Sequence, residues 1–289
     1  MNAHLLKLVW VGILAGMTTA FYLVSPAAVR QALTTILLLA APSLRAQVGA
    51  ATPEAHAPNA TRARLARIDS LLERAVADST ITGAVGLVLR DGKVLYERAA
   101  GWADKASARR MAPDAIFRIA SQTKALTSVA IMALVEQGKL ALDDRVSDYL
   151  PTFAKTTVQL GGTTAAVAAR RQITIRDLLT HTAGVSYGTD TQVAEQYRAA
   201  GLGPAAGWGW YTADKEEPTC TSMDRLGTLP FVQQPGSAFV YGYSTDILGC
   251  VVERVSGMPL DEFFRMRITA PLRMNDAHFF LPDAKRARF

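Results

Sequence analysis

The most constraining feature of the sequence is a two-residue turn, Asp91-Gly92, which separates the apolar segments 84–89 and 94–96. An Asp-Gly pair between two such segments is a strong signal for a β-hairpin, because both residues tolerate the backbone that a tight turn requires. The later segments 121–137 and 246–255 instead repeat apolar residues every three to four positions, as helices do. One hairpin followed by several helices predicts a mixed α/β protein with a helical subdomain.

Local signals predict the remaining elements. Apolar periodicity predicts a further helix over residues 61–77. A capping-box pattern at Thr174-Ile175-Arg176-Asp177 predicts a short helix that ends by Gly184, and Pro259 could open another helix that runs through Arg267. Segments 156–170 and 186–222 are rich in Gly, Thr and Ala, and they are predicted to be long loops. The residues predicted to face inward are Leu126, Val129, Ala130, Ala133 and Leu134 in one helix, and Ile247, Leu248, Val251, Val252 and Val255 in another.

The net charge gives no indication of a nucleic-acid partner. The chain carries a formal charge of +6, and half of it comes from residues 1–46, which contain Lys7, Arg30 and Arg45 and no acid. The remaining +3 is ordinary for a soluble domain, and no basic run is interleaved with aromatic residues. We therefore expect no nucleic acid as a partner.

Residues 1–50 are predicted to be a targeting segment. The apolar runs 8–24 and 32–41 allow two interpretations: a signal peptide that is removed, which we favour, or a membrane anchor. The sequence thus predicts an exported protein, periplasmic or secreted, that contacts a membrane only through an uncleaved leader. The folded domain is predicted to span 51–289.

The cysteines and histidines suggest no metal or cofactor. Export would permit a disulfide between Cys220 and Cys250, but the sequence does not show whether they lie close together, and two free thiols are the favoured interpretation. The chain has no C-x-x-C, and its four histidines lack the spacing of metal ligands. We therefore predict no metal site.

The first candidate for chemistry is Ser121-Gln122-Thr123-Lys124, at the start of the predicted helix 121–137. A spacing of three places Ser121 and Lys124 on one helix face, about one turn apart. If that face is buried, desolvation lowers the pKa of the lysine, and the lysine can then accept the proton of the serine nucleophile. The alternative is a helix cap beside a solvated lysine.

The second candidate is Tyr241, in Tyr241-Gly242-Tyr243-Ser244. A phenol serves as a general base or proton relay when a nearby cation lowers its pKa, and Lys124 is the candidate cation. The alternative is a tyrosine that simply packs in the core.

These residues carry a family resemblance. The stretch from Phe117 to Lys124 resembles the S-x-x-K nucleophile motif of the serine β-lactamase and penicillin-binding-protein superfamily. Other phrases agree in order and spacing: Gly138-Lys139-Leu140, Tyr149-Leu150-Pro151, Ile173 to Gly184, Tyr241 with Ser244 to Gly249, and Pro271-Leu272. The resemblance covers roughly residues 62–289. It is strongest to the class C β-lactamase-related branch that includes the family VIII carboxylesterases.

The resemblance implies a β-lactamase-like fold, with an antiparallel sheet flanked by helices, and an acyl-enzyme mechanism. Ser121 would attack a carbonyl, Lys124 and Tyr241 would accept and return its proton, and the Ser121 backbone N–H would supply half of an oxyanion hole. The implied partner is a small-molecule ester, amide or β-lactam, and no cofactor is implied. A carboxylesterase-like activity is favoured, with a β-lactamase or D-Ala-D-Ala carboxypeptidase as the alternative.

Two departures from the family pattern matter. The Y-x-N motif reads Tyr241-Gly242-Tyr243, so the Asn that contacts the side-chain amide of a β-lactam is missing, which favours an esterase. No K-T-G or H-x-G follows Tyr241, and the sequence ends at Phe289, before the region where that motif is expected. The sequence thus resembles a C-terminally truncated member with an incomplete sheet. An inactive or non-catalytic binding protein is therefore a further alternative.

A rival nucleophile is Ser186 in Gly184-Val185-Ser186-Tyr187-Gly188, which matches the G-x-S-x-G elbow of α/β-hydrolases. Asp246 and His278 follow in the order that a triad would need. The elbow requires a strand before it and a helix after it, however, and the sequence predicts a helix before and a loop after. The aromatic residues expected to line an acyl pocket or to pack the long loop are Trp208, Trp210 and Tyr211.

Overall fold

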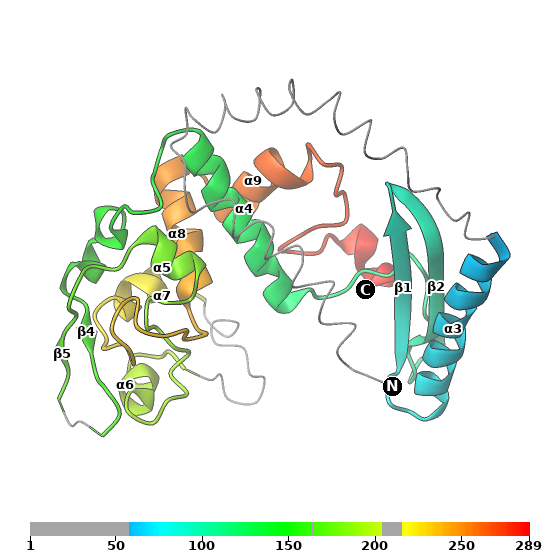
Figure 1. Ribbon diagram of the computed structural model, residues 1–289, viewed down its shortest axis with the longest axis horizontal. Coiled ribbons are helices and arrows are strands. Elements are labelled where there is room, and N and C mark those ends of the chain that lie inside the picture. The colour runs from blue at the N-terminus through cyan, green and yellow to red at the C-terminus, as the bar shows by residue number, and fades with distance from the viewer. Residues whose placement is uncertain (1–57, 163–164, 204–215) are drawn as a thin grey trace, which may run out of the picture. The chain divides into compact units, whose positions relative to one another are not determined.

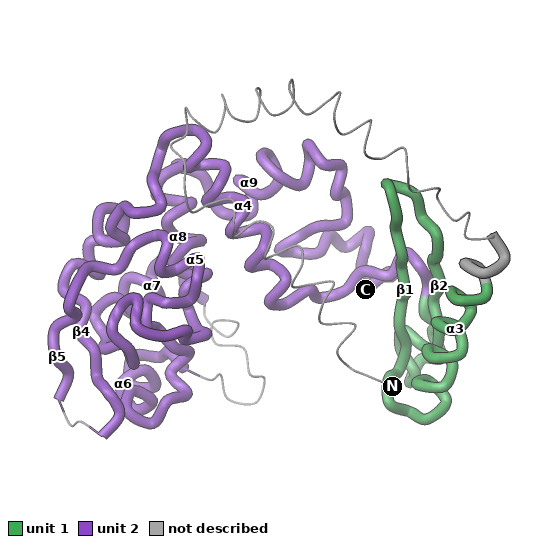
Figure 2. The backbone as a smooth tube through the Cα atoms, viewed as in Figure 1, with its two compact units in different colours: residues 1–111 green, residues 112–289 purple. Residues whose placement is uncertain are grey.

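The computed structural model of the chain describes residues 58–162, 165–203 and 216–289. The predicted leader at 1–50 and the aromatic residues at 208–211 lie outside these ranges. The chain divides into two compact units, residues 1–111 and 112–289 (Figure 2). The hydrolase domain predicted over 51–289 stays a prediction. Within the described ranges, no helix combines the length and the apolar character that a bilayer crossing needs.

The first unit contains the predicted hairpin. Its elements are α3 (Pro58–Ala77), β1 (Gly83–Arg90) and β2 (Lys93–Asp104), which are labelled in Figure 1, and the short β3 (Arg109–Arg110). The strands form an antiparallel sheet in the order β1-β2-β3. Asp91 and Gly92 both have positive φ, at 52° and 72°, which is the backbone of the tight hairpin turn that the sequence predicts.

Helix α3 packs on one face of this sheet. A Cβ atom at Gly86 of β1 would lie 3.0 Å from a ring carbon of Tyr96 and 3.5 Å from a methyl carbon of Leu72, so glycine here leaves room for the Tyr96 ring beside the helix. The phenol of Tyr96 in β2 donates a hydrogen bond to Asp69 of α3 at 2.7 Å, and Arg98 forms an ion pair with the same carboxylate at 3.2 Å. The apolar side chains of the hairpin that remain exposed are Leu87, Leu89, Val94 and Leu95.

The second unit contains most of the helices and the larger core. Its helices are α4 (Thr123–Glu136), α5 (Ile175–Leu179), α6 (Ala194–Ala199), α7 (Thr219–Leu226), α8 (Ser244–Ser256) and α9 (Leu260–Phe264). Two short strands, β4 (Thr157–Val158) and β5 (Val167–Ala168), pair antiparallel. Small antiparallel sheets with many helices confirm the predicted mixed α/β class.

Three sequence predictions need correction. The supposed loops 156–170 and 186–222 contain β4, β5, α6 and the start of α7, which are too short to produce a recognisable period. The helix expected to run to Arg267 ends at Phe264, and a π-type turn follows. Val129 is 51% exposed rather than inward, because α4 is apolar on nearly every side and its period does not identify the buried face.

Helices α4 and α8 pack against each other in the core of the second unit. The buried residues of α4 are Thr127, Ala130, Ile131 and Leu134, and those of α8 include Ile247, Leu248, Val251 and Val252. Gly257, with φ at 71°, ends α8 in the left-handed conformation that glycine tolerates best. Four of the five α8 residues predicted to face inward are therefore confirmed as buried.

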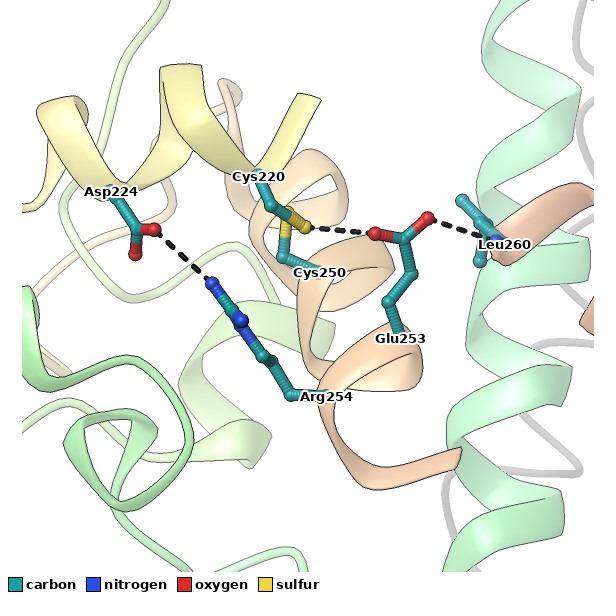
Figure 3. Close-up of a disulfide and its surroundings, with 6 residues drawn as sticks. All are labelled: Cys220, Asp224, Cys250, Glu253, Arg254 and Leu260. Carbon is teal, nitrogen blue, oxygen red and sulfur yellow. Dashed lines mark hydrogen bonds and ion pairs between the residues drawn. A yellow bond between two sulfur atoms is a disulfide. The ribbon is translucent and has the colours of Figure 1, made fainter. Parts of the chain in front are cut away.

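A disulfide between Cys220 of α7 and Cys250 of α8 joins two neighbouring helices (Figure 3). This corrects the favoured interpretation of two free thiols. The packing of α7 on α8 brings the two Cα atoms to 5.2 Å, within the range of a disulfide. No local sequence pattern around either cysteine predicts this proximity, because it depends on how the two helices pack. Glu253 lies 3.1 Å from the Cys220 sulfur and also accepts a hydrogen bond from the backbone of Leu260. A disulfide sulfur has no proton, so the first contact is a close approach rather than a hydrogen bond.

We predict that removing this disulfide destabilises the fold. The bridge closes a loop with a sequence separation of 30 residues, for which chain-entropy arguments give about 3.6 kcal/mol. The double variant Cys220→Ala/Cys250→Ala should therefore lose about that much unfolding free energy in urea. Wild-type protein treated with a reductant is the control, and it should unfold at the same urea concentration as the double variant. An unchanged midpoint after reduction would contradict the prediction.

Candidate active site

Ser121 and Lys124 lie at the start of α4, on adjacent turns. Ser121 sits in a short 3₁₀ turn, Ala120–Gln122, that leads directly into the helix, and the Lys124 ammonium donates a hydrogen bond to Ser121 Oγ at 3.2 Å. The helix has no side-chain N-cap, so the serine hydroxyl is not used to cap it. Ser121 is exposed and Lys124 half-buried. The burial on which the sequence argument depended is therefore only partial.

The backbone just before Ser121 is unusual. Ala120 has a φ of 43°, in the left-handed region that a residue with a side chain rarely adopts. Such residues persist where the surrounding structure fixes them, and they gather at functional sites. No signal at Ala120 in the sequence predicts this conformation.

Tyr241 comes from a segment 120 positions further along the chain, and its phenol lies against the same serine. The phenol donates a hydrogen bond to Ser121 Oγ at 2.7 Å, and the Lys124 nitrogen lies 4.7 Å from the centre of the phenol ring. Burial alone would raise the pKa of Tyr241. Hydrogen bonding with Lys124 and Ser121, together with the Lys124 charge, outweighs burial, and the pKa is lowered from 10.0. The structure therefore brings Ser121, Lys124 and Tyr241 together around one oxygen atom.

Two segments paired through their backbones place Tyr241. Segment 181–184 follows α5, and segment 232–243 precedes α8. The backbone N–H groups of Val232, Gly236 and Val240 donate to the carbonyls of Gly184, Thr182 and His181 at 2.9, 2.8 and 2.8 Å. At Gly184, with φ at 85°, a Cβ atom would lie 2.0 Å from the carbonyl oxygen of Gln233, so only glycine allows this approach.

Two aromatic rings contact Tyr241, which stays 44% exposed. The rings of His181 and Tyr187 lie 4.9 and 5.7 Å from the Tyr241 ring, measured between centroids. Tyr243 is fully buried, stacks edge-on against Tyr187 at 4.9 Å, and accepts a hydrogen bond from the backbone of Gly203. Sequence reasoning did not assign a role to His181 or Tyr187. The signal for the histidine was present, because it lies within the phrase 173–184 that carries the family resemblance.

Asp177 fixes the start of the first of these segments. It completes the predicted capping box with Thr174 and forms a two-pronged ion pair with Arg171, at 2.5 and 2.8 Å. It also accepts a hydrogen bond from the Thr182 hydroxyl at 3.2 Å. Burial would raise the pKa of Asp177, but the bonds from Arg171 and Thr174 and the Arg171 charge hold it below its usual value.

We predict that Asp177→Asn destabilises the second unit by roughly 2–4 kcal/mol near pH 7, because it breaks a partly buried charge pair. Since the folded pKa is lowered, the Asp177 carboxylate stabilises the fold above about pH 3.9, the usual value for an unfolded Asp. That contribution is lost as the pH falls through the lower, folded pKa. Thermal melts between pH 2 and 7 should therefore show a smaller acid loss in the variant.

A matched control for this test is Asp143→Asn. Asp143 also pairs with an arginine, Arg176, at 3.0 Å, but its side chain is 79% exposed. An exposed pair contributes under about 1 kcal/mol, so this variant should melt close to wild type. If the two variants melt alike, the structural role given to Asp177 is wrong.

The rival nucleophile has a different environment. Ser186 is buried, and its hydroxyl accepts a hydrogen bond from the backbone of Gly188 at 3.0 Å. Among the described residues, Ser186, Asp246 and His278 make no hydrogen bond to one another, and His278 instead contacts Lys285. Burial raises the pKa of Asp246 to about 6, although the nearby Lys124 charge opposes the shift. These positions do not form a triad.

A mixed α/β chain whose Ser-x-x-Lys serine lies against a distant tyrosine has the fold and site arrangement of the serine β-lactamase and penicillin-binding-protein superfamily. The chain belongs to the beta-lactamase family, whose model matches residues 68–289. This confirms the resemblance inferred from the sequence motifs.

The similar proteins include esterases. The chain is 34% identical to the esterase EstB of Burkholderia gladioli over 221 residues, which covers 76% of this chain and 53% of that protein. Among solved structures, it is similar to EstCE1, described as a hydrolase with promiscuous acyltransferase activity, with a TM-score of 0.63 and 32% identity over 74% of this chain and 52% of that one.

The simvastatin synthase LovD of Aspergillus terreus is similar at a TM-score of 0.56 and 29% identity, covering 72% of this chain and 51% of that one. The chain thus spans about half the length of the curated relatives and solved structures that it matches.

Proposed function

We propose that this protein is a serine hydrolase that cleaves carboxylic esters through an acyl-serine intermediate. The observation that carries the proposal is the environment of Ser121 Oγ, which lies within hydrogen-bond distance of both the Lys124 ammonium and the Tyr241 phenol. A serine hydroxyl is a weak nucleophile until a neighbouring group removes its proton. Lys124 and Tyr241 are the candidate proton acceptors, and their short distances to Ser121 Oγ support the proposal. The names of EstB and EstCE1 support ester chemistry.

The lowered pKa of Tyr241 suggests which group starts the reaction. In the described geometry Lys124 and Tyr241 both donate to Ser121, so one of them must first lose its proton. The phenol of Tyr241 is favoured for this step, because the adjacent Lys124 charge stabilises the phenolate. The phenolate then accepts the proton of Ser121 as its oxygen attacks the ester carbonyl. The same proton passes to the departing alcohol, and water then cleaves the acyl-serine by the reverse sequence.

The surroundings of Tyr243 support an ester over a β-lactam. Tyr243 stands where the Y-x-N pattern has the Asn that contacts the side-chain amide of a β-lactam. Its side chain is fully buried, and its hydroxyl is engaged with the backbone of Gly203 at 3.2 Å. It is therefore turned into the core and does not offer an amide-binding group to a substrate at Ser121.

We predict that a fluorophosphonate probe labels Ser121 in the protein expressed to the end of its reading frame. Ser121→Ala should abolish labelling, and Lys124→Ala and Tyr241→Phe should each lower the turnover of p-nitrophenyl butyrate by roughly 100-fold or more, the usual effect of losing acid–base help. Peptide mapping of the labelled protein identifies the modified serine.

Ser186→Ala is the control and should keep both labelling and turnover, because that hydroxyl is buried. Label that survives in Ser121→Ala would assign the nucleophile to another residue. A folded protein that takes up no label and turns over no ester would instead favour the non-catalytic alternative.

We also predict that the protein hydrolyses p-nitrophenyl butyrate with a much higher kcat/KM than a chromogenic cephalosporin. The reason is the missing amide contact at Tyr243, because a site that lacks a specific polar contact binds the corresponding transition state less well. Both rates are measured in one preparation, with Ser121→Ala as the background. A higher kcat/KM for the cephalosporin would make β-lactamase the better description.

A further inference from the structure

His181 lies beside Tyr241 and is not used by the proposed mechanism. The imidazole ring is 4.9 Å from the Tyr241 ring, measured between centroids, with the two planes tilted by 37°. The imidazole ring also contacts the ring of Phe239, with the centroids 5.6 Å apart. The imidazole therefore contacts two aromatic residues of the segment that carries the phenol.

The backbone of His181 is tied to the same segment. Its carbonyl accepts a hydrogen bond from the N–H of Val240, the residue just before Tyr241, at 2.8 Å. Its φ of 55° is in the left-handed region, which histidine enters more readily than most residues but which still persists only where neighbours enforce it. Both the ring and the backbone of one residue thus restrain the position of Tyr241.

The charge on the imidazole is also constrained. Burial lowers the pKa of His181, the Lys124 charge lowers it further, and a hydrogen bond with the Val240 backbone partly opposes both. The titratable groups that face the ring within the described ranges are Lys124 and Tyr241. The Nδ1 atom is buried and has no hydrogen-bond partner among the described residues. The imidazole therefore contacts Tyr241 by packing of the two rings, and Nδ1 makes no hydrogen bond in that contact.

We propose that His181 is a positioning residue for Tyr241: its ring packs on the phenol and its carbonyl holds Val240, which keeps the phenol oxygen against Ser121 Oγ. The proposal rests on the proposed function, because it assigns a role within the same proton transfer. A displacement of about 1 Å between reacting groups can lower a rate by about 100-fold, so loss of this support affects kcat more than substrate binding.

The test compares His181→Asn and His181→Phe with wild type. Asparagine also tolerates a left-handed backbone but has no ring, so kcat for p-nitrophenyl butyrate should fall by roughly 10- to 100-fold while KM changes less than about twofold. Phenylalanine restores a ring without either nitrogen. Its side chain is less well tolerated at a φ of 55°, so the thermal midpoint should fall, while kcat should return to within about threefold of wild type. The matched control is Leu178→Ala, which removes a core side chain near the segment and should lower the thermal midpoint while leaving kcat nearly unchanged.

A double-mutant cycle with Tyr241→Phe tests whether His181 acts through the phenol. In that background His181→Asn should cause no further loss of kcat. An equal loss in both backgrounds, an unchanged kcat for His181→Asn, or a folded His181→Phe that stays as slow as the asparagine variant would each overturn the proposal. If Tyr241→Phe itself is fully active, the role given to the phenol fails, and with it the positioning role of His181. If the folded wild-type protein hydrolyses no ester, the proposed function fails instead, so the two failures are distinguishable.

Discussion

The packing of α4 against α8 is the constraint on which the candidate site depends. Both helices bury apolar faces in one core, and the residues just before each helix, Ser121 and Tyr241, meet at 2.7 Å. The positive end of the α4 dipole favours negative charge near Ser121, worth about 0.3–1 kcal/mol, and Lys124 adds a full positive charge on the next turn. The hydrophobic core therefore brings together the groups that would stabilise an attacking oxygen.

Nearby polar and glycine contacts make this arrangement rigid. Asp177 holds the start of segment 181–184 through Arg171 and Thr182, and the backbone pairing at Gly184 leaves no room for a side chain. Few other conformations are open to these two contacts, the buried ion pair of Asp177 and the close backbone approach at Gly184. Breaking either contact would leave polar groups without hydrogen-bond partners. The tyrosine is thus positioned by its own segment and by a second segment that packs on it.

Local signals in the sequence predicted much of the fold, and the family resemblance identified the three candidate residues. Features that depend on contacts between distant segments could not be predicted from the sequence. The Asp91-Gly92 turn and the Thr174–Asp177 capping box depend only on neighbouring residues, and the structure has both. Family spacing pointed to Ser121, Lys124 and Tyr241, although the meeting of the first and last depends on helix packing that no local pattern describes. The pairing of Cys220 with Cys250 depends on the same kind of packing.

The disulfide has a consequence for how samples of this protein compare. Tyr241 lies inside the loop that Cys220 and Cys250 close, so the bridge removes freedom from the segment that presents the phenol as well as from the fold. In a reducing cytosol that tether is open, and in an oxidising compartment it is closed. Preparations from the two environments therefore share one sequence but differ in one covalent bond. The redox history of a sample thus affects how strongly the Tyr241 phenol is restrained.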